Sequence, residues 1–148
     1  MMKKKVLLII ALAVVVTLGA VFAVLNIHAP GELSIWQKKE IEYHWAKTQK
    51  HTFRGWDDEG ITLGMRYYGS ENGYIILLAF PDGSLGTLVT KVIANQKFEF
   101  KYGGFMLFAY KNGVFHDLSD AYDQGLVSKA AIINAKILHD KRQETFSW

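Results

Sequence analysis

The chain has 148 residues and no cysteine, and its 17 Lys and Arg residues outnumber its 14 Asp and Glu residues by three. The lack of thiols excludes disulfides, thiol nucleophiles, zinc ribbons and iron–sulfur clusters. Three of the basic residues are Lys3, Lys4 and Lys5, so the remainder carries 14 charges of each sign. A neutral remainder argues against nucleic acid as a partner, because nucleic-acid binding needs a positive face.

An apolar run follows these lysines. Residues 6–25 carry no charge, and Thr17 is their only polar side chain. Twenty helical residues rise about 30 Å, which matches the hydrocarbon core of a bilayer. The run predicts a transmembrane anchor within residues 1–28, a cytoplasmic N-terminus and an extracytoplasmic remainder. A signal peptide cleaved after Ala23 is the alternative, and the protein would then be secreted.

The run also contains small residues that permit close packing against the helix of a membrane partner. These residues are Ala11, Ala13, Gly19, Ala20 and Ala23. They add a further hypothesis, in which the anchor itself pairs with another subunit.

A linker at residues 29–33 is expected next, because Pro30 and Gly31 end the first helix. Residues 34–148 then suit a single domain. Ser34 and Gln37 have the spacing of a capping box, which predicts a helix ending near residue 49.

From residue 52 the hydrophobic period changes from helical to two, as in strands. Asn72-Gly73 predicts a tight hairpin turn, and the apolar run at residues 74–80 predicts a central strand. The expected strands are residues 61–68, 74–80, 85–94, 97–102, 105–110 and 114–116.

Two helices are expected at the C-terminal end. Asp117 or Ser119 can cap a short helix through Tyr122. Ser128 can cap the last helix, residues 129–141, whose apolar stripe is expected to be Ala130, Ile133 and Ile137. The whole pattern predicts an α+β fold: an N-terminal transmembrane or signal helix, one further helix, an antiparallel meander of five to six strands, and two C-terminal helices. We expect the helices to cover one face of the sheet.

Several segments of the second half together form one pattern. They are Tyr67-Tyr68-Gly69, Asn72-Gly73-Tyr74, Phe98-Glu99-Phe100, Ala109-Tyr110-Lys111-Asn112-Gly113 and Leu118-Ser119-Asp120-Ala121-Tyr122-Asp123-Gln124-Gly125-Leu126. Over residues 67–137 the chain resembles a group of small uncharacterised proteins of Gram-positive bacteria, which are secreted or membrane-tethered. The resemblance implies an aromatic strand, a short helical segment and a final helix, and it implies no activity.

No segment has the spacing of a catalytic, cofactor-binding or metal-binding motif. The five histidines are scattered: His28, His44, His51, His116 and His139. The acidic run at residues 57–59 is expected to be a solvated turn, because three consecutive acids cannot all point at one calcium ion. We therefore expect no cofactor and no metal.

The aromatic side chains give the one positive indication of function. They exceed what the core of such a domain needs, and we expect four of them to form a partner-binding surface: Trp36, Trp56, Tyr68 and Tyr74. The favoured hypothesis is a non-enzymatic, membrane-tethered accessory domain of the bacterial envelope that binds an envelope protein or a peptide. The alternative is a secreted cell-wall hydrolase that gathers Glu59, Glu99 and His116 in one cleft.

Overall fold

The computed structural model describes residues 2–26, 31–81, 87–101 and 104–145. The chain divides into two compact units, Met1–Lys39 and Glu40–Trp148. Parts of four expected segments lie outside the described residues. These are residues 1 and 27–28 of the anchor, residues 29–30 of the linker, the start of the third strand at 85–86, and residue 102 at the end of the fourth strand.

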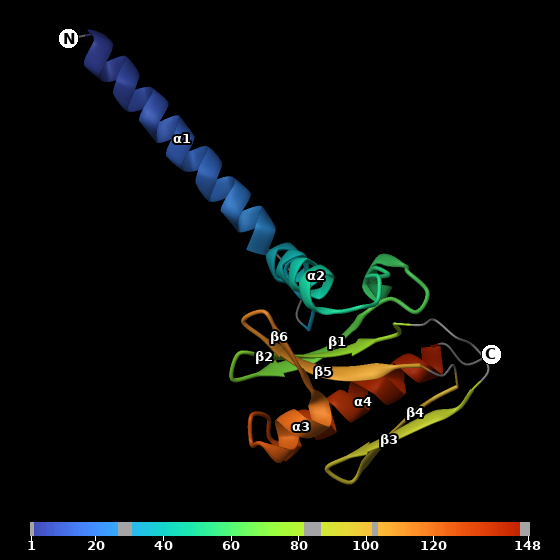
Figure 1. Cartoon of the computed structure of the whole chain (residues 1–148). Coiled ribbons are helices and arrows are strands. Elements are labelled where there is room, and N and C mark those ends of the chain that lie inside the picture. Colours follow the sequence, from blue (N-terminus) through green and yellow to red (C-terminus); the bar gives the residue numbers. More distant parts are fainter. Residues whose placement is uncertain (1, 27–30, 82–86, 102–103, 146–148) are drawn as a thin grey trace. The chain divides into compact units, whose positions relative to one another are not determined.

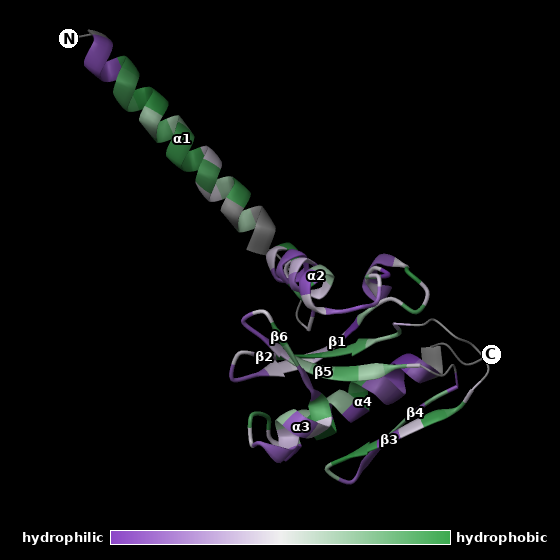
Figure 2. Ribbon diagram, in the orientation of Figure 1, coloured by the Kyte–Doolittle hydropathy of each residue, from purple (hydrophilic) through white to green (hydrophobic). Residues whose placement is uncertain are grey.

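The first unit consists mainly of α1, Met2–Asn26 (Figure 1). Its stretch Lys3–Val21 is long and apolar enough to cross a membrane, and none of that stretch is buried. Figure 2 shows apolar residues along most of this helix beyond the lysines. The Thr17 hydroxyl donates to the Ala13 carbonyl at 2.8 Å, so its polar group is satisfied within the helix. The helix is therefore compatible with a membrane anchor or a signal sequence.

The second helix, α2, spans Ile35–Thr48. The Ser34 backbone N–H donates to Gln37 Oε1 at 2.9 Å, and the Gln37 N–H donates to Ser34 Oγ at 3.2 Å. These reciprocal bonds confirm the capping box and fix the start of the helix.

A four-stranded antiparallel sheet is the centre of the second unit (Figure 1). It contains β1 (Arg66–Glu71), β2 (Tyr74–Ala79), β5 (Met106–Lys111) and β6 (Val114–Asp117), in the order β1-β2-β5-β6. Asn72 and Gly73 both have positive φ, 51° and 79°, as the two-residue turn between β1 and β2 requires. The hairpin predicted at Asn72-Gly73 is thus confirmed.

A second, two-stranded sheet consists of β3 (Val89–Ile93) and β4 (Gln96–Phe100). The α+β fold with six antiparallel strands is confirmed. The strands do not form one continuous meander, however. The strand β2 pairs with β5, and among the described strands β3 and β4 pair only with each other.

Both faces of the four-stranded sheet are covered. On one face the Trp45 ring of α2 lies 5.8 Å from the Phe108 ring and 5.5 Å from the Phe115 ring. On the other face Ile76 and Leu107 join a buried cluster with residues of α4 and β4. The expectation that all helices cover one face was wrong, because the two central strands are apolar on both sides and need cover on both.

Two helices end the described chain, α3 (Leu118–Asp123) and α4 (Lys129–Thr145). The Asp117 carboxylate accepts hydrogen bonds from the N–H groups of Ser119 and Asp120, so the predicted cap of α3 is confirmed. Ser128 Oγ accepts from the Ala131 N–H at 3.2 Å, which confirms the cap of α4.

The buried face of α4 differs from the prediction. Its buried residues are Ala131, Ile132, Ala135 and His139. The expected stripe of Ala130, Ile133 and Ile137 is exposed instead. Apolar residues lie on both faces of this helix, so its packing against β1 and β4 decides which of them are buried.

Candidate functional site

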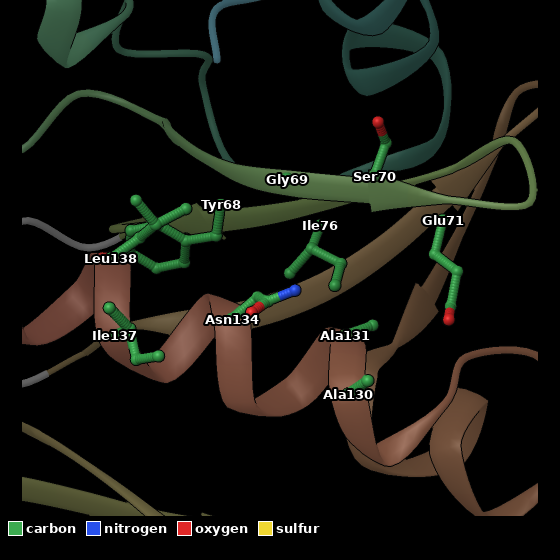
Figure 3. A pocket seen from close by; sticks show the side chains of 10 residues that line it. All are labelled: Tyr68, Gly69, Ser70, Glu71, Ile76, Ala130, Ala131, Asn134, Ile137 and Leu138. Carbon is green, nitrogen blue, oxygen red and sulfur yellow. The ribbon is translucent and has the colours of Figure 1, made fainter.

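A groove of about 430 Å³ lies between the C-terminal part of β1 and α4 (Figure 3). Residues 68–71 of β1 and Ile76 of β2 form one wall. The wall on α4 consists of Ala130, Ala131, Asn134, Ile137 and Leu138. The groove is therefore mainly apolar, with a few polar groups.

Small residues and a strand irregularity account for the space. The pairing of β1 with β2 shifts between Tyr67 and Ser70, and Gly69 within this bulge has φ of 105°. A Cβ built at Gly69 would meet no atom within 4 Å. Ala130 and Ala131 face this segment with short side chains (Figure 3). A bulge and two alanines thus leave a hollow where larger residues would close the contact.

The β1 strand is an edge of the sheet, and among the described strands it pairs with β2 alone. One outward carbonyl, that of Tyr67, accepts a long hydrogen bond of 3.5 Å from Arg142 Nη2. At the other end of the groove, Ser128 donates to Glu71 from its N–H at 2.7 Å and from its hydroxyl at 2.5 Å. Between these ties the strand edge at Gly69 and Ser70 adjoins the groove.

Two polar side chains of the groove wall are the charged carboxylate of Glu71 and the neutral amide of Asn134. The hydrogen bonds from the Ser128 hydroxyl and N–H lower the pKa of Glu71, so this carboxylate stays charged at neutral pH. Asn134 extends from α4 toward β1 in Figure 3, and its amide makes no hydrogen bond to another described residue. An exposed amide of this kind is ready to donate to and accept from a ligand.

A buried polar cluster lies behind the groove. The fully buried Tyr68 hydroxyl is 2.9 Å from His139 Nδ1, and His139 Nε2 is 2.9 Å from the Glu99 carbonyl. A bond to that carbonyl requires a proton on Nε2, so the neutral ring accepts a hydrogen bond from the Tyr68 hydroxyl at Nδ1. The Gln143 amide lies 2.6 Å from the same Nε2, and this tautomer places the amide oxygen toward the ring. This chain of bonds joins β1, α4 and β4.

Burial keeps both groups of this pair neutral. It raises the pKa of Tyr68 to about 12, although the neighbouring Arg66 opposes the rise. It lowers the pKa of His139, and the positive charge of Arg66 lowers it further. Neither group faces solvent, so the pair holds one wall of the groove in place.

Arg66 and Asp57 extend the cluster. The Arg66 side chain is 1% exposed, its Nε lies 3.3 Å from Asp57 Oδ2, and Arg142 pairs with the same oxygen. Asp57 begins the short 3-10 helix η1 (Asp57–Glu59). The prediction of a solvated acidic turn was wrong for Asp57, because its side chain is 9% exposed and pairs with two arginines.

The four aromatic residues predicted to bind a partner do not form one surface. Trp56 is 2% exposed and Tyr68 is fully buried, so both side chains pack inside the domain. Tyr74 is half-buried against the His116 ring at 6.0 Å. Trp36, on α2, is 58% exposed. Tyr68 still contributes to the groove wall, and Trp36 keeps an open aromatic face.

The residues of the hydrolase alternative lie on three separate elements. Glu59 belongs to η1 and His116 to β6, while Glu99 of β4 pairs with Lys97 at 2.6 Å. Within the described part of the chain, no group of three or more His, Asp or Glu residues is placed to hold a metal ion. Hydrolytic activity remains a prediction.

No family model, curated protein or solved structure matches this chain. The sequence contained one indication of the groove, Gly69, because a glycine inside a strand pattern indicates a bulge or a close approach of another group. Asn134 and the alanines of α4 had no such signal, because their position depends on which face of the helix is buried.

Proposed function

We propose that the chain is a non-enzymatic binding protein of the bacterial envelope, held on the extracytoplasmic side by α1. In this proposal the groove between β1 and α4 takes up an extended polypeptide segment of a partner. The apolar stretch Lys3–Val21 supports the membrane tether, and the groove supports the binding function.

One observation carries the proposal: an open strand edge and an exposed apolar helix face border the same groove. Ile137 is 48% exposed and Leu138 is 37% exposed, and both line the groove beside β1. An added strand would complete the backbone hydrogen bonds of the edge and cover these side chains. The edge supplies affinity through the main chain, and the hollow supplies selectivity for a side chain.

The chemistry of the walls indicates the composition of the segment. Among the described residues of the lining, Glu71 is the only carboxylate, and it would repel an acidic residue at that end. The remaining wall is apolar apart from Ser70, Asn134 and the edge backbone. The expected occupant is therefore an extended segment with alternating apolar side chains and no acidic residue near Glu71.

A peptide-display selection tests this proposal. The full chain, reconstituted in lipid nanodiscs, is used to select from a random heptapeptide library. We expect enrichment of sequences with alternating apolar residues, and slower amide hydrogen exchange at Gly69 and Ser70 when a selected peptide binds. Both effects follow from strand addition at β1.

Ala130→Trp supplies the decisive variant, because an indole at this exposed position fills the groove without emptying the core. Gln124→Trp is the matched control, since it places an indole at an exposed position after α3 and outside the lining. Selected peptides should lose binding to the first variant and keep it with the second. Equal binding to both variants would overturn the proposal.

A further inference from the structure

The strand β1 and the helix α4 run side by side along the groove, in opposite directions. At one end of the groove the Tyr68 hydroxyl is bonded to His139, and at the other end Glu71 accepts hydrogen bonds from Ser128. Figure 3 shows the labelled residues of the two walls in this matching order. A segment added beside β1 would therefore lie along the helix as well as along the strand.

The spacing of the helix wall matches the spacing of side chains on such a segment. Ala130, Asn134 and Leu138 line the groove at intervals of four residues, which is about 6 Å of helix rise. Side chains on one face of a strand recur every second residue, at about 6.7 Å. An added strand would thus place one side chain against each of these three residues.

Asn134 lies at the centre of this wall. Its amide points toward β1 in Figure 3 and forms no hydrogen bond with another described residue. Ile137 and Leu138 line the wall on one side of it, and Ala130 and Ala131 on the other. An added segment would remove water from the amide, and a buried amide without a partner is strongly unfavourable. The side chain that meets Asn134 therefore has to be an amide or a hydroxyl, which both donate and accept.

Glu71 places a negative charge at the Ala130 end of the groove. Its carboxyl group extends from β1 toward α4 in Figure 3. One oxygen accepts from the Ser128 N–H and the other from the Ser128 hydroxyl, so each oxygen keeps capacity for a second donor. The short side chains of Ala130 and Ala131 leave the hollow beside it. The aliphatic stem of a lysine or arginine fits such a hollow while its charged end reaches the carboxylate.

Among the described residues, no basic side chain pairs with Glu71. Lys111 Nζ donates to the Asn72 carbonyl at 3.2 Å. Lys129 is exposed next to Ser128, and the pKa of Glu71 is lowered by the hydrogen bonds from Ser128 rather than by a nearby cation. The carboxylate therefore offers its charge to a cation brought by the partner.

We propose that the groove selects an extended segment by three side chains that face α4: an apolar one against Leu138, an amide or hydroxyl against Asn134, and a lysine or arginine that pairs with Glu71. The inference rests on the proposed function and names the class of segment that the groove binds. It narrows the alternating apolar pattern, because the apolar contact comes from the first side chain and from the aliphatic stem of the third.

Paired peptides test the charge. A peptide selected by the full chain in nanodiscs is compared with the same peptide carrying norleucine in place of its lysine. We expect the lysine form to bind the parent about fivefold more tightly, as for a partly exposed ion pair. Glu71→Gln, which keeps an acceptor for Ser128, should bind the two forms equally. The matched control Asp123→Gln removes an exposed carboxylate at the end of α3, outside the lining, and should keep the preference.

A second pair of peptides tests the central position. Selected peptides with asparagine there are compared with forms that carry leucine. The parent should prefer asparagine by about tenfold, because leucine would leave the Asn134 amide buried without a partner. Asn134→Leu should reverse this preference, and the control Gln124→Leu, outside the lining, should keep it. Each comparison is a ratio within one variant, so a general loss of stability would not imitate either result.

This inference and the proposed function fail by different results. Selected peptides that lose binding to Ala130→Trp but carry no basic residue at a fixed position would overturn this inference and leave groove binding intact. The same conclusion would follow if the lysine preference were equal in the parent and Glu71→Gln, or if Asn134→Leu kept the parent's preference. If the parent selected no peptide, or if Ala130→Trp bound the selected peptides normally, both proposals would be overturned.

Discussion

The Tyr68 hydroxyl and His139 Nδ1, 71 positions apart in the sequence, form a buried hydrogen bond of 2.9 Å. The bond joins the edge strand β1 to α4, the two elements that border the groove. Because His139 is also bonded to the Glu99 carbonyl, one imidazole connects three elements.

Removal of this hydroxyl tests its contribution to stability. Tyr68→Phe leaves a buried acceptor on His139 without a donor, which should lower the free energy of unfolding by about 1–3 kcal/mol. The control is Tyr67→Phe, whose hydroxyl bonds to Ser70 at the surface. That change should cost less than about 0.5 kcal/mol. Chemical denaturation of the full chain in detergent measures both, and equal losses would contradict the role assigned to Tyr68.

The pKa of His139 makes stability depend on pH. Burial lowers this pKa in the folded state, whereas the unfolded side chain has a pKa of about 6.5. As pH falls below that value, the unfolded state binds the proton first, so stability decreases. We expect the loss between pH 7 and pH 5 to be smaller in His139→Gln than in the parent. His51→Gln, at an exposed position, should keep the full slope.

The ion pairs of Asp57 should be strongly coupled to folding. Asp57→Asn removes the carboxylate that faces Arg66, which is almost fully buried, and Arg142. Loss of one partner of a buried pair should cost about 3 kcal/mol. Asp58→Asn, on the exposed side of the same short helix, should cost less than about 0.5 kcal/mol. Thermal unfolding compares them, and a neutral Asp57→Asn would show that the pair adds nothing.

Gly69 should resist substitution for conformational reasons alone. Its φ of 105° is unfavourable for any residue with a Cβ, although the space beside it is open. Gly69→Ala should therefore cost about 1–3 kcal/mol of stability. Ser70→Ala, one residue away and exposed, is the control and should stay within about 0.5 kcal/mol of the parent. A neutral Gly69→Ala would indicate that the bulge relaxes.

Local chemistry in the sequence predicted the ends of the elements. Ser34 with Gln37, Asn72 with Gly73, and Asp117 each satisfy backbone groups within a few residues, so their roles follow from short spacing. These signals were sufficient for the α+β order of elements.

Features that depend on contacts between distant residues could not be predicted from the sequence. The apolar residues of α4 permit two buried faces, and the one that contains His139 is selected by Tyr68 and Glu99, which are distant in sequence. The same limit applies to Trp56, whose burial depends on tertiary contacts, and to the isolated β3–β4 pair. The groove could not be predicted because it results from that choice of helix face.

The bulge at Gly69 also bears on self-association. Flat, long strand edges pair with identical chains and nucleate fibrils, and a bulge twists such an edge out of line. In β1 the bulge and the Arg142 contact at the Tyr67 carbonyl leave only a short accessible stretch. The same irregularity that opens the groove should therefore hinder amyloid-like stacking of the chain.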